Sequence, residues 1–295
     1  MFEMLPAGLR SFIDLINQIG LEKVFLLLMG PIFIVCMSWE AWWLSRKQRQ
    51  TYTIRETLVN VVLALSHAVA DGIAWALVLG LFYALYRHRL FVIPMNAGTV
   101  VGLLVAQDFL YYWFHRGSHR IRWMWASHVT HHSSERMNLS TALRQSVTYP
   151  VSGMWVFWLP LAWIGFKPEH VVLVVAVSLG YQFFVHTEAV KKLPAWFEAI
   201  FNTPSHHRVH HARNPQYIDR NYAGVLIVWD KLFGTFAPEQ APCEYGITRQ
   251  IHTSNPLVMM FHEWRDMWRD VFKPGPLWLR VKHLWAPPEW ERPEA

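Results

Sequence analysis

The stretch AGTVVGLLVAQDFLYYWFHRGSH, residues 97–119, combines the two features that decide the fold of this chain. Residues 97–114 are mostly apolar, and as a helix they could cross a hydrocarbon core of about 30 Å. The run then ends in His115 and His119, which are four residues apart and therefore share one face of a helix. This pattern predicts a membrane span that delivers two imidazoles to one membrane surface.

The composition of the whole chain is typical of a membrane protein. Of its 295 residues 53% are hydrophobic and 16% are charged, whereas soluble domains carry about 25% charged residues. The 17 tryptophans fit this class, because indole rings gather at membrane–water interfaces. The net charge of +6 lies in short basic groups beside apolar runs, so nucleic acid is not an expected partner. Two cysteines, Cys36 and Cys243, are too few for a disulfide framework.

Five apolar runs are candidate membrane spans: 24–44, 58–86, 97–114, 148–166 and 171–190. The basic run RKQRQ at 46–50 marks the end of the first run as cytoplasmic. The second run is longer than one span requires, and crossing would leave Arg87 and Arg89 outside. A re-entrant segment or a bent hairpin would avoid that conflict. We therefore expect an all-α, multi-pass integral membrane protein with four or five transmembrane helices.

Four regions are expected along the chain: an amphipathic N-terminal segment (1–23), a transmembrane bundle (24–190), a cytoplasmic helical cap (191–250) and an amphipathic C-terminal tail (251–295). The tail has an apolar stripe at helical spacing, formed by Leu257, Phe261, Trp264, Trp268 and Val271. This stripe predicts a helix that lies against the membrane surface or packs on the domain.

The histidines recur in sets with helical spacing. HVTHH contains His128, His131 and His132, and HHRVHH repeats the same i, i+3, i+4 pattern with His207, His210 and His211. His186 closes the fifth apolar run. If all five runs cross the membrane, every one of these sets reaches the cytoplasmic side.

So many imidazoles in one place predict a metal centre. Buried imidazoles need polar partners, and metal coordination satisfies all of them together. Nine nitrogen ligands are too many for one ion, which indicates two metals. Nitrogen donors suit Fe, Zn, Cu and Ni, and the absence of Cys from the sets disfavours structural zinc. A redox site at a membrane surface suits the oxidation of a lipid C–H bond by O₂.

The series HRGSH…HVTHH…HHRVHH resembles the fatty acid hydroxylase / sterol desaturase superfamily of integral-membrane di-iron oxygenases, over residues 108–236. NLSTALRQS at 138–146, HTE at 186–188 and the stretch 203–236 are more similar to its alkylglycerol monooxygenase branch. That branch cleaves ether lipids by hydroxylating the carbon next to the ether oxygen, with tetrahydrobiopterin as reductant. The resemblance implies two iron ions, which zinc can replace in purified protein.

The resemblance also implies the metal ligands, which are His115, His119, His128, His131, His132, His186, His207, His210 and His211. His206 matches the family pattern as a tenth ligand or as a neighbour of the ligands.

Three polar residues near these histidine sets are candidate site residues, and each has both a functional and a purely structural interpretation. Asp108 precedes His115 by seven residues, so it either orients a ligand imidazole or makes a helix–helix hydrogen bond. The resemblance places Glu135 and Asn138 close to the metals, with Glu135 a candidate for binding the reductant or a pterin. Their alternative roles are an exposed acid and a helix cap.

Electrons for such a reaction come from outside, because the sequence has no GxGxxG after a strand, no CxxC series and no HPGG motif. A ferredoxin, a cytochrome b5-like protein or a reduced pterin is the expected donor, docking on the basic cytoplasmic face. Two enzyme alternatives remain, a sterol or lipid desaturase and a hydroxylase of lipid headgroups. A membrane metal transporter or sensor is the alternative from another class.

Overall fold

The computed structural model describes residues 21–47 and 51–293, and within these ranges the regular elements are all helices, as expected. In chain order they are α2 Leu21–Arg46, α3 Ile54–Arg87, α4 Ala97–Arg120, α5 Arg122–His132, η2 Leu139–Leu143, α6 Tyr149–Ser152, η3 Met154–Trp158, α7 Leu159–Ile164, α8 Pro168–Val185, α9 Ala195–Ile200, α10 Pro204–His210, α11 Val228–Leu232, α12 Pro256–Phe272 and α13 Leu277–Lys282.

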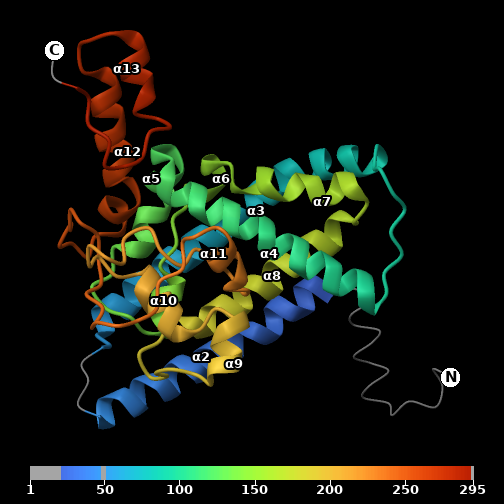
Figure 1. Ribbon diagram of the computed structural model, residues 1–295, viewed down its shortest axis with the longest axis horizontal. Helices are drawn as coiled ribbons and strands as arrows, with labels where there is room; N and C mark the ends of the chain where they lie inside the picture. The colour runs from blue at the N-terminus through green and yellow to red at the C-terminus, as the bar shows by residue number, and fades with distance from the viewer. Residues whose placement is uncertain (1–20, 48–50, 294–295) are drawn as a thin grey trace.

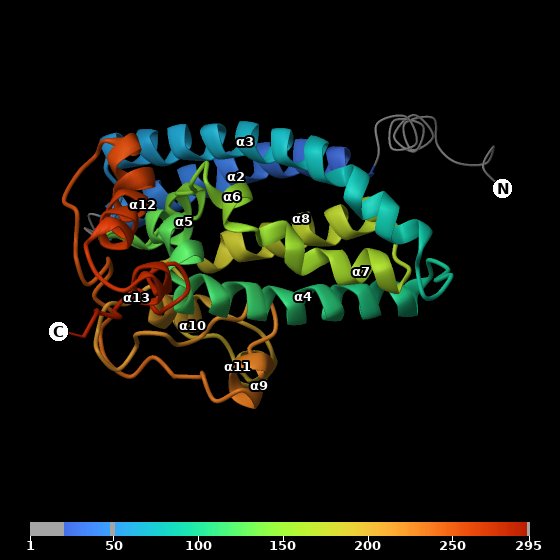
Figure 2. The same ribbon diagram turned by 90° about the horizontal axis from the view of Figure 1, so that it is seen from above.

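Three helices of the described chain are long and apolar enough to cross a membrane: α2, α3 and α8. The 24-residue α4 runs beside them in the same bundle (Figures 1 and 2). The second apolar run forms one continuous helix of 34 residues, about 51 Å long. It is therefore neither a re-entrant segment nor a hairpin of two helices. Most of the expected N-terminal segment, residues 1–20, lies outside the described residues.

The prediction that residues 148–166 form one span is wrong. This run is divided into α6, η3 and α7, each at most six residues long. Pro150 and Pro160 lack the N–H that a continuous helix needs, and Gly153 has a φ of 85° that ends α6. Gly165, with a φ of 139°, ends α7 where a Cβ would meet the carbonyl oxygen of Phe91 at 2.2 Å.

The main hydrophobic core lies between α3, α4, α7 and η3. Its buried members include Phe82 and Leu103 from the two long helices, and Trp158 and Leu161 from the broken run. Because these side chains are buried together, α4 is held along its length against α3 and the broken run. The ends of α4 and α8 that carry histidines lie at the end of the bundle where α5, α10 and α12 are found (Figure 2).

Candidate metal centre

Nine buried histidines converge at this end of the bundle in two groups. Within each group the ligand atoms lie within 4.8 Å of one another. The first group contains His115, His119, His128, His132 and His210, and the second contains His131, His186, His207 and His211. These nine are the ligands that the sequence predicted, and the chain has brought them together from four separate segments.

The local sequence explains how each segment presents its histidines. Ile121 adopts an extended conformation (φ −120°, ψ 114°), which breaks α4 from α5 and turns the second histidine set back toward the first. Thr203 caps α10 by accepting from the backbone N–H of His206, and Pro204 follows at the first helical position. Both α5 and α10 supply ligands to each group, because adjacent residues such as His131 and His132 point to different groups.

Backbone carbonyls orient the rings. The Nδ1–H of His115 donates to the carbonyl of Tyr222 (2.7 Å), and that of His186 to Gln182 (2.6 Å). His210 and His131 likewise face backbone carbonyls at 3.0 and 3.3 Å. A carbonyl can only accept a hydrogen bond, so the proton of each neutral ring lies on Nδ1. The Nε2 atoms are therefore unprotonated and free to bind metal.

Within the two groups the Nε2 atoms of neighbouring rings lie close together. Those of His186 and His131 are 3.0 Å apart, as are those of His115 and His128. His131 and His186 both carry the ring proton on Nδ1, so their two unprotonated Nε2 atoms repel each other at that distance. Protonation is disfavoured, because burial lowers the pKa well below the usual 6.5 for His131, His132, His207, His210 and His211. The donor set therefore fits metal ions, which replace this repulsion with coordination.

The loop of residues 219–222 holds three of the five histidines in the first group. The carbonyls of Arg220 and Tyr222 accept from His210 and His115, and an Asp219 carboxylate oxygen lies 3.5 Å from Nδ1 of His119. Burial alone would raise the pKa of Asp219, but His119 and Arg120 hold it down at about 2. No motif or spacing in the sequence marks Asp219 as a neighbour of the histidines.

This loop has an uncommon backbone. Asp219 and Asn221 have φ values of 61° and 57°, a left-handed conformation that Asp and Asn tolerate better than most residues. The side chain of Asn221 donates to the carbonyls of His206 and Ala237. Buried Asp230 accepts from the N–H groups of Tyr222 and Ala223, both at 2.8 Å. These contacts hold the conformation that aims the loop at the histidines.

Asp108 does not meet a histidine. Its carboxylate accepts from the N–H groups of Val225 (2.8 Å) and Leu226 (2.9 Å) and from the indole of Trp229 (3.0 Å). The expectation that it orients a ligand ring is thus not met. The backbone reaches it because Gly224 has no side chain, and a Cβ there would lie 3.0 Å from an Asp108 oxygen. Asp108 braces α4 against the segment that follows the ligand-holding loop.

Three other candidates lie outside the two ligand groups. Glu135 is exposed and forms an ion pair with His252 at 3.2 Å. Asn138 is buried and caps η2, as its alternative role anticipated. The Nδ1 of His206 is buried and has no hydrogen-bond partner among the described residues. Its ring packs against Phe236, and it belongs to neither ligand group.

A buried glutamate joins α2 to segments that lie next to the centre. Glu40 of α2 accepts from the backbone N–H of Leu139 (2.8 Å) and from the hydroxyls of Tyr52 and Thr187. Thr187 follows His186 directly, so this contact joins α2 to the end of α8 that carries a ligand.

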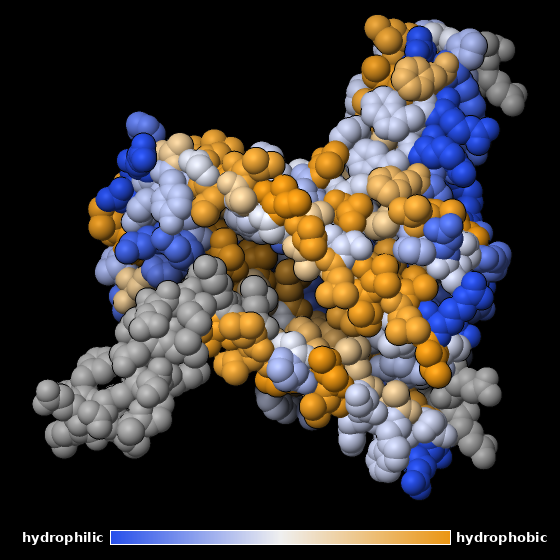
Figure 3. All heavy atoms as spheres, turned by 180° about the vertical axis from the view of Figure 1, so that it is seen from behind, coloured by the Kyte–Doolittle hydropathy of each residue, from blue (hydrophilic) through white to orange (hydrophobic). Residues whose placement is uncertain are grey.

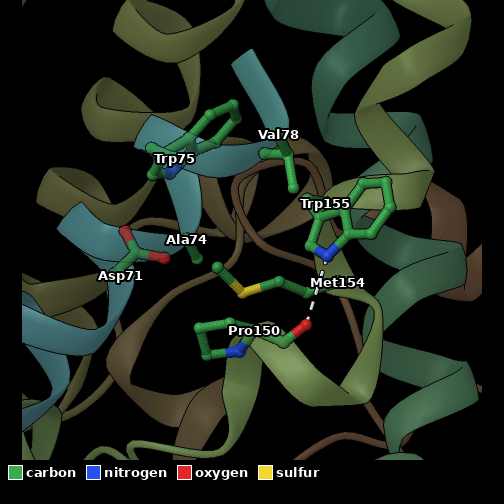
Figure 4. Close-up of a pocket in the computed structure, with 7 residues that line it drawn as sticks. All are labelled: Asp71, Ala74, Trp75, Val78, Pro150, Met154 and Trp155. Carbon is green, nitrogen blue, oxygen red and sulfur yellow. Dashed lines mark hydrogen bonds between the residues drawn. The ribbon is translucent and has the colours of Figure 1, made fainter. Parts of the chain in front are cut away.

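A narrow crevice, too tight to hold a water molecule, lies between α3 and the broken run (Figure 4). It is lined by Asp71, Ala74, Trp75, Val78, Pro150, Met154 and Trp155. One helical turn from Asp71, the ring of His67 packs against Tyr149 at 5.6 Å. The Tyr149 hydroxyl in turn lies 2.5 Å from Nδ1 of His128. Contacts thus lead from His67, next to this crevice, through Tyr149 to the first ligand group.

Long apolar helices that end in a buried, all-histidine donor set define a membrane protein with a metal centre. Residues 100–235 match the family model described as fatty acid hydroxylase. Residues 100–235 thus carry a fatty acid hydroxylase domain.

Curated relatives agree with this assignment. The chain is 45% identical to the alkylglycerol monooxygenase of Homo sapiens, over 70% of this chain and 46% of the relative. It is 47% identical to that of Danio rerio, over 62% and 40%. An ornithine lipid hydroxylase of Rhizobium tropici is 29% identical, over 54% and 48%. The chain thus spans less than half of the length of each of these relatives. No solved structure matches it.

Proposed function

We propose that this protein is a membrane-bound di-iron monooxygenase that hydroxylates a C–H bond of an ether lipid, at the carbon next to the ether oxygen. The observation that carries the proposal is the convergence of nine histidines into two adjacent groups at the end of an apolar helical bundle. The similarity to alkylglycerol monooxygenases supports the substrate class.

Each histidine group would hold one iron ion, through the Nε2 atoms that the backbone carbonyls leave unprotonated. When bound, the two ions would supply the redox chemistry by which O₂ attacks an unactivated C–H bond. Zinc fits the same donors and can occupy the site in purified protein. The protein's own part is to fix nine rings and to keep bulk water away from them.

The proposed reaction inserts one oxygen atom of O₂ into the C–H bond and releases the other as water. Two electrons and two protons come from an external reductant, for which a reduced pterin, a ferredoxin or a cytochrome b5-like protein is proposed. Hydroxylation next to an ether oxygen gives a hemiacetal, which breaks into a fatty aldehyde and an alcohol. The lipid would reach the centre from the bilayer, and the hydrophobic face of the bundle is hollowed near its middle (Figure 3).

We also propose that the chain is multi-pass and that its metal centre faces the cytoplasm. Arg46 and Lys47 follow the apolar part of α2, and Lys191 and Lys192 follow α8. The bond between Glu40 and Thr187 joins these two helix ends beside the histidines. A concentration of basic residues at this end supports a cytoplasmic position under the positive-inside rule.

The test is lipid mass spectrometry on cells that express the intact protein or its His131→Ala variant under heavy-isotope O₂. The proposal expects ether lipids to be lost and fatty aldehydes or acids carrying heavy oxygen to appear with the intact protein only. His206→Ala is the matched control and should retain activity, because His206 lies in neither ligand group.

Other outcomes would assign other functions. A stable lipid with one added heavy oxygen would indicate a headgroup or chain hydroxylase, and a loss of two hydrogens would indicate a desaturase. Metal binding without consumption of O₂ and reductant would favour a transporter or sensor. Any of these results would contradict ether cleavage.

A further inference from the structure

The α12–α13 hairpin projects from the end of the bundle that carries the histidines. Figure 1 shows it standing across the direction of α3 and α7. If the bundle helices cross the membrane, such an arm runs along the membrane surface. The expected C-terminal amphipathic segment therefore has a definite place, at the level where the bundle leaves the hydrocarbon core.

The hairpin has an apolar face that is exposed in the part of the chain that the structure describes. Leu257, Phe261, Trp268 and Phe272 lie on one face of α12 and are exposed, Phe272 by 69%. Leu277 and Trp278, at the start of α13, are also exposed, by 69% and 63%. Figure 3 shows hydrophobic residues on the side of the hairpin turned toward the length of the bundle, and hydrophilic residues on its outer side.

Cations border this apolar face. Arg265, Trp268, Arg269, Phe272 and Lys273 line one open groove along the outer half of α12. The rings of Trp268 and Phe272 stack in it with centroids 5.9 Å apart. A strip of aromatic rings beside a strip of Arg and Lys is typical of segments that lie in the headgroup layer, with rings among the acyl chains and cations at the phosphates.

The hairpin is rigidly attached to the helix that carries three ligands. Arg122, the first residue of α5, is almost fully buried and donates to Glu263 and Asp270 of α12, each at 2.7 Å. The backbone N–H groups of Arg122 and Trp123 donate to the carbonyls of Ala286 and Leu284 beyond α13. A force on the hairpin is thus transmitted to α5, and through it to His128, His131 and His132.

We infer that the exposed face of the α12–α13 hairpin docks on the phospholipid surface of the bilayer in which the bundle sits. The docked hairpin fixes the depth of the metal centre beneath the headgroups. A bilayer is favoured over a second copy of the chain, because the aromatic face is turned toward the apolar length of the bundle and is bordered by cations. This inference rests on the proposal that the bundle crosses the membrane, and not on the reaction.

Spin-label accessibility tests it in the full chain. Single cysteines at Phe272→Cys and Trp278→Cys, in a Cys36→Ala and Cys243→Ser background, would be labelled and reconstituted into phosphatidylcholine–phosphatidylglycerol vesicles. Collisions with O₂, which concentrates in acyl chains, are compared with those of a water-soluble nickel chelate. Asp266→Cys is the matched control, since Asp266 lies on α12 away from the apolar face.

The expected result is a ratio of O₂ to nickel collisions that is several-fold higher at positions 272 and 278 than at 266. Equal, water-like ratios at all three positions would overturn the inference, because the face would then lie in solvent. Exclusion of both reagents at 272 and 278 would also overturn it, and would assign the face to contact with another copy of the chain. Metal content equal to that of the parent shows that each labelled variant is folded.

Discussion

The Nε2 atoms of His131 and His186 lie 3.0 Å apart, while each ring directs its Nδ1 at a backbone carbonyl. His131 lies in α5 and His186 at the end of α8, so the pair forms only when these two helices pack together. Their facing lone pairs repel each other, and a cation bound between them would remove this repulsion and so stabilise the fold.

Metal removal should therefore destabilise the protein. A metal that binds only the folded chain adds about 4 kcal/mol when its free concentration is about a thousand times its Kd. We expect a chelator to lower the midpoint of thermal unfolding in detergent, and added Fe²⁺ or Zn²⁺ to restore it. An unchanged midpoint after verified metal loss would contradict a structural contribution of the metal.

The two groups of ligands predict separate losses of metal. His115→Ala should remove metal from the first group and His211→Ala from the second, so each variant should retain about one ion per chain where the parent holds two. Elemental analysis of purified protein measures this. His206→Ala is the control and should keep both ions. A loss of metal in His206→Ala would restore it as a tenth ligand.

Asp219→Asn should weaken metal binding at the first group, because the neutral amide is a poorer acceptor for His119. Loss of such an outer partner typically costs about 10- to 100-fold in metal affinity. Competition with a chromogenic chelator measures the change. Glu289→Gln is a matched control, since Glu289 also pairs with Arg120 but does not touch His119. Equal effects of the two substitutions would indicate that only the surface ion pairs matter.

Asp108→Ala should be strongly destabilising. The substitution leaves two backbone N–H groups and one indole N–H without their acceptor, and each unsatisfied buried donor costs about 1–3 kcal/mol. Asp108→Asn keeps one acceptor oxygen and should lose less. Unfolding midpoints of the two variants test this order. If the parent and both variants unfolded alike, the brace between α4 and residues 225–229 would be unimportant.

Cys243 should be nearly inert to alkylation at pH 8. Burial, followed by the charge of Glu239, raises the pKa of its thiol to about 12. The reactive thiolate is then roughly a thousandfold scarcer than in an ordinary thiol, and its fraction should rise about tenfold per pH unit. Peptide mass spectrometry after timed labelling follows this site apart from Cys36. Fast labelling at pH 8 would show that the segment around Cys243 opens.

The sequence predicted the histidines well because their signal is local. Spacings of three and four residues place imidazoles on one helical face, whatever lies beyond it. The division into groups of five and four could not be predicted, since the neighbours His131 and His132 serve different groups. The role of Asp219 was also hidden, because it depends on two left-handed residues and on contacts with distant Ala237 and Asp230.

The error over residues 148–166 has a related cause. An apolar run of sequence indicates that its residues are buried, but not whether protein or lipid surrounds them. Three short helices packed between α3 and α4 are therefore as apolar as a membrane span. The prolines at 150 and 160 were the signal that distinguished the two. For Asp108 the sequence indicated a buried acid that needs a partner, but its actual donors lie more than a hundred residues away.

Because α5 and α10 each carry ligands for both groups, an ion bound at one group should favour binding of an ion at the other. The first ion to bind orders both helices and so places the second set of nitrogens in advance. By thermodynamic linkage the coupling is reciprocal: each ion raises the affinity of the protein for the other ion by the same factor. A metal titration should then be steeper than simple saturation, and chains with a single ion should be scarce at intermediate loading.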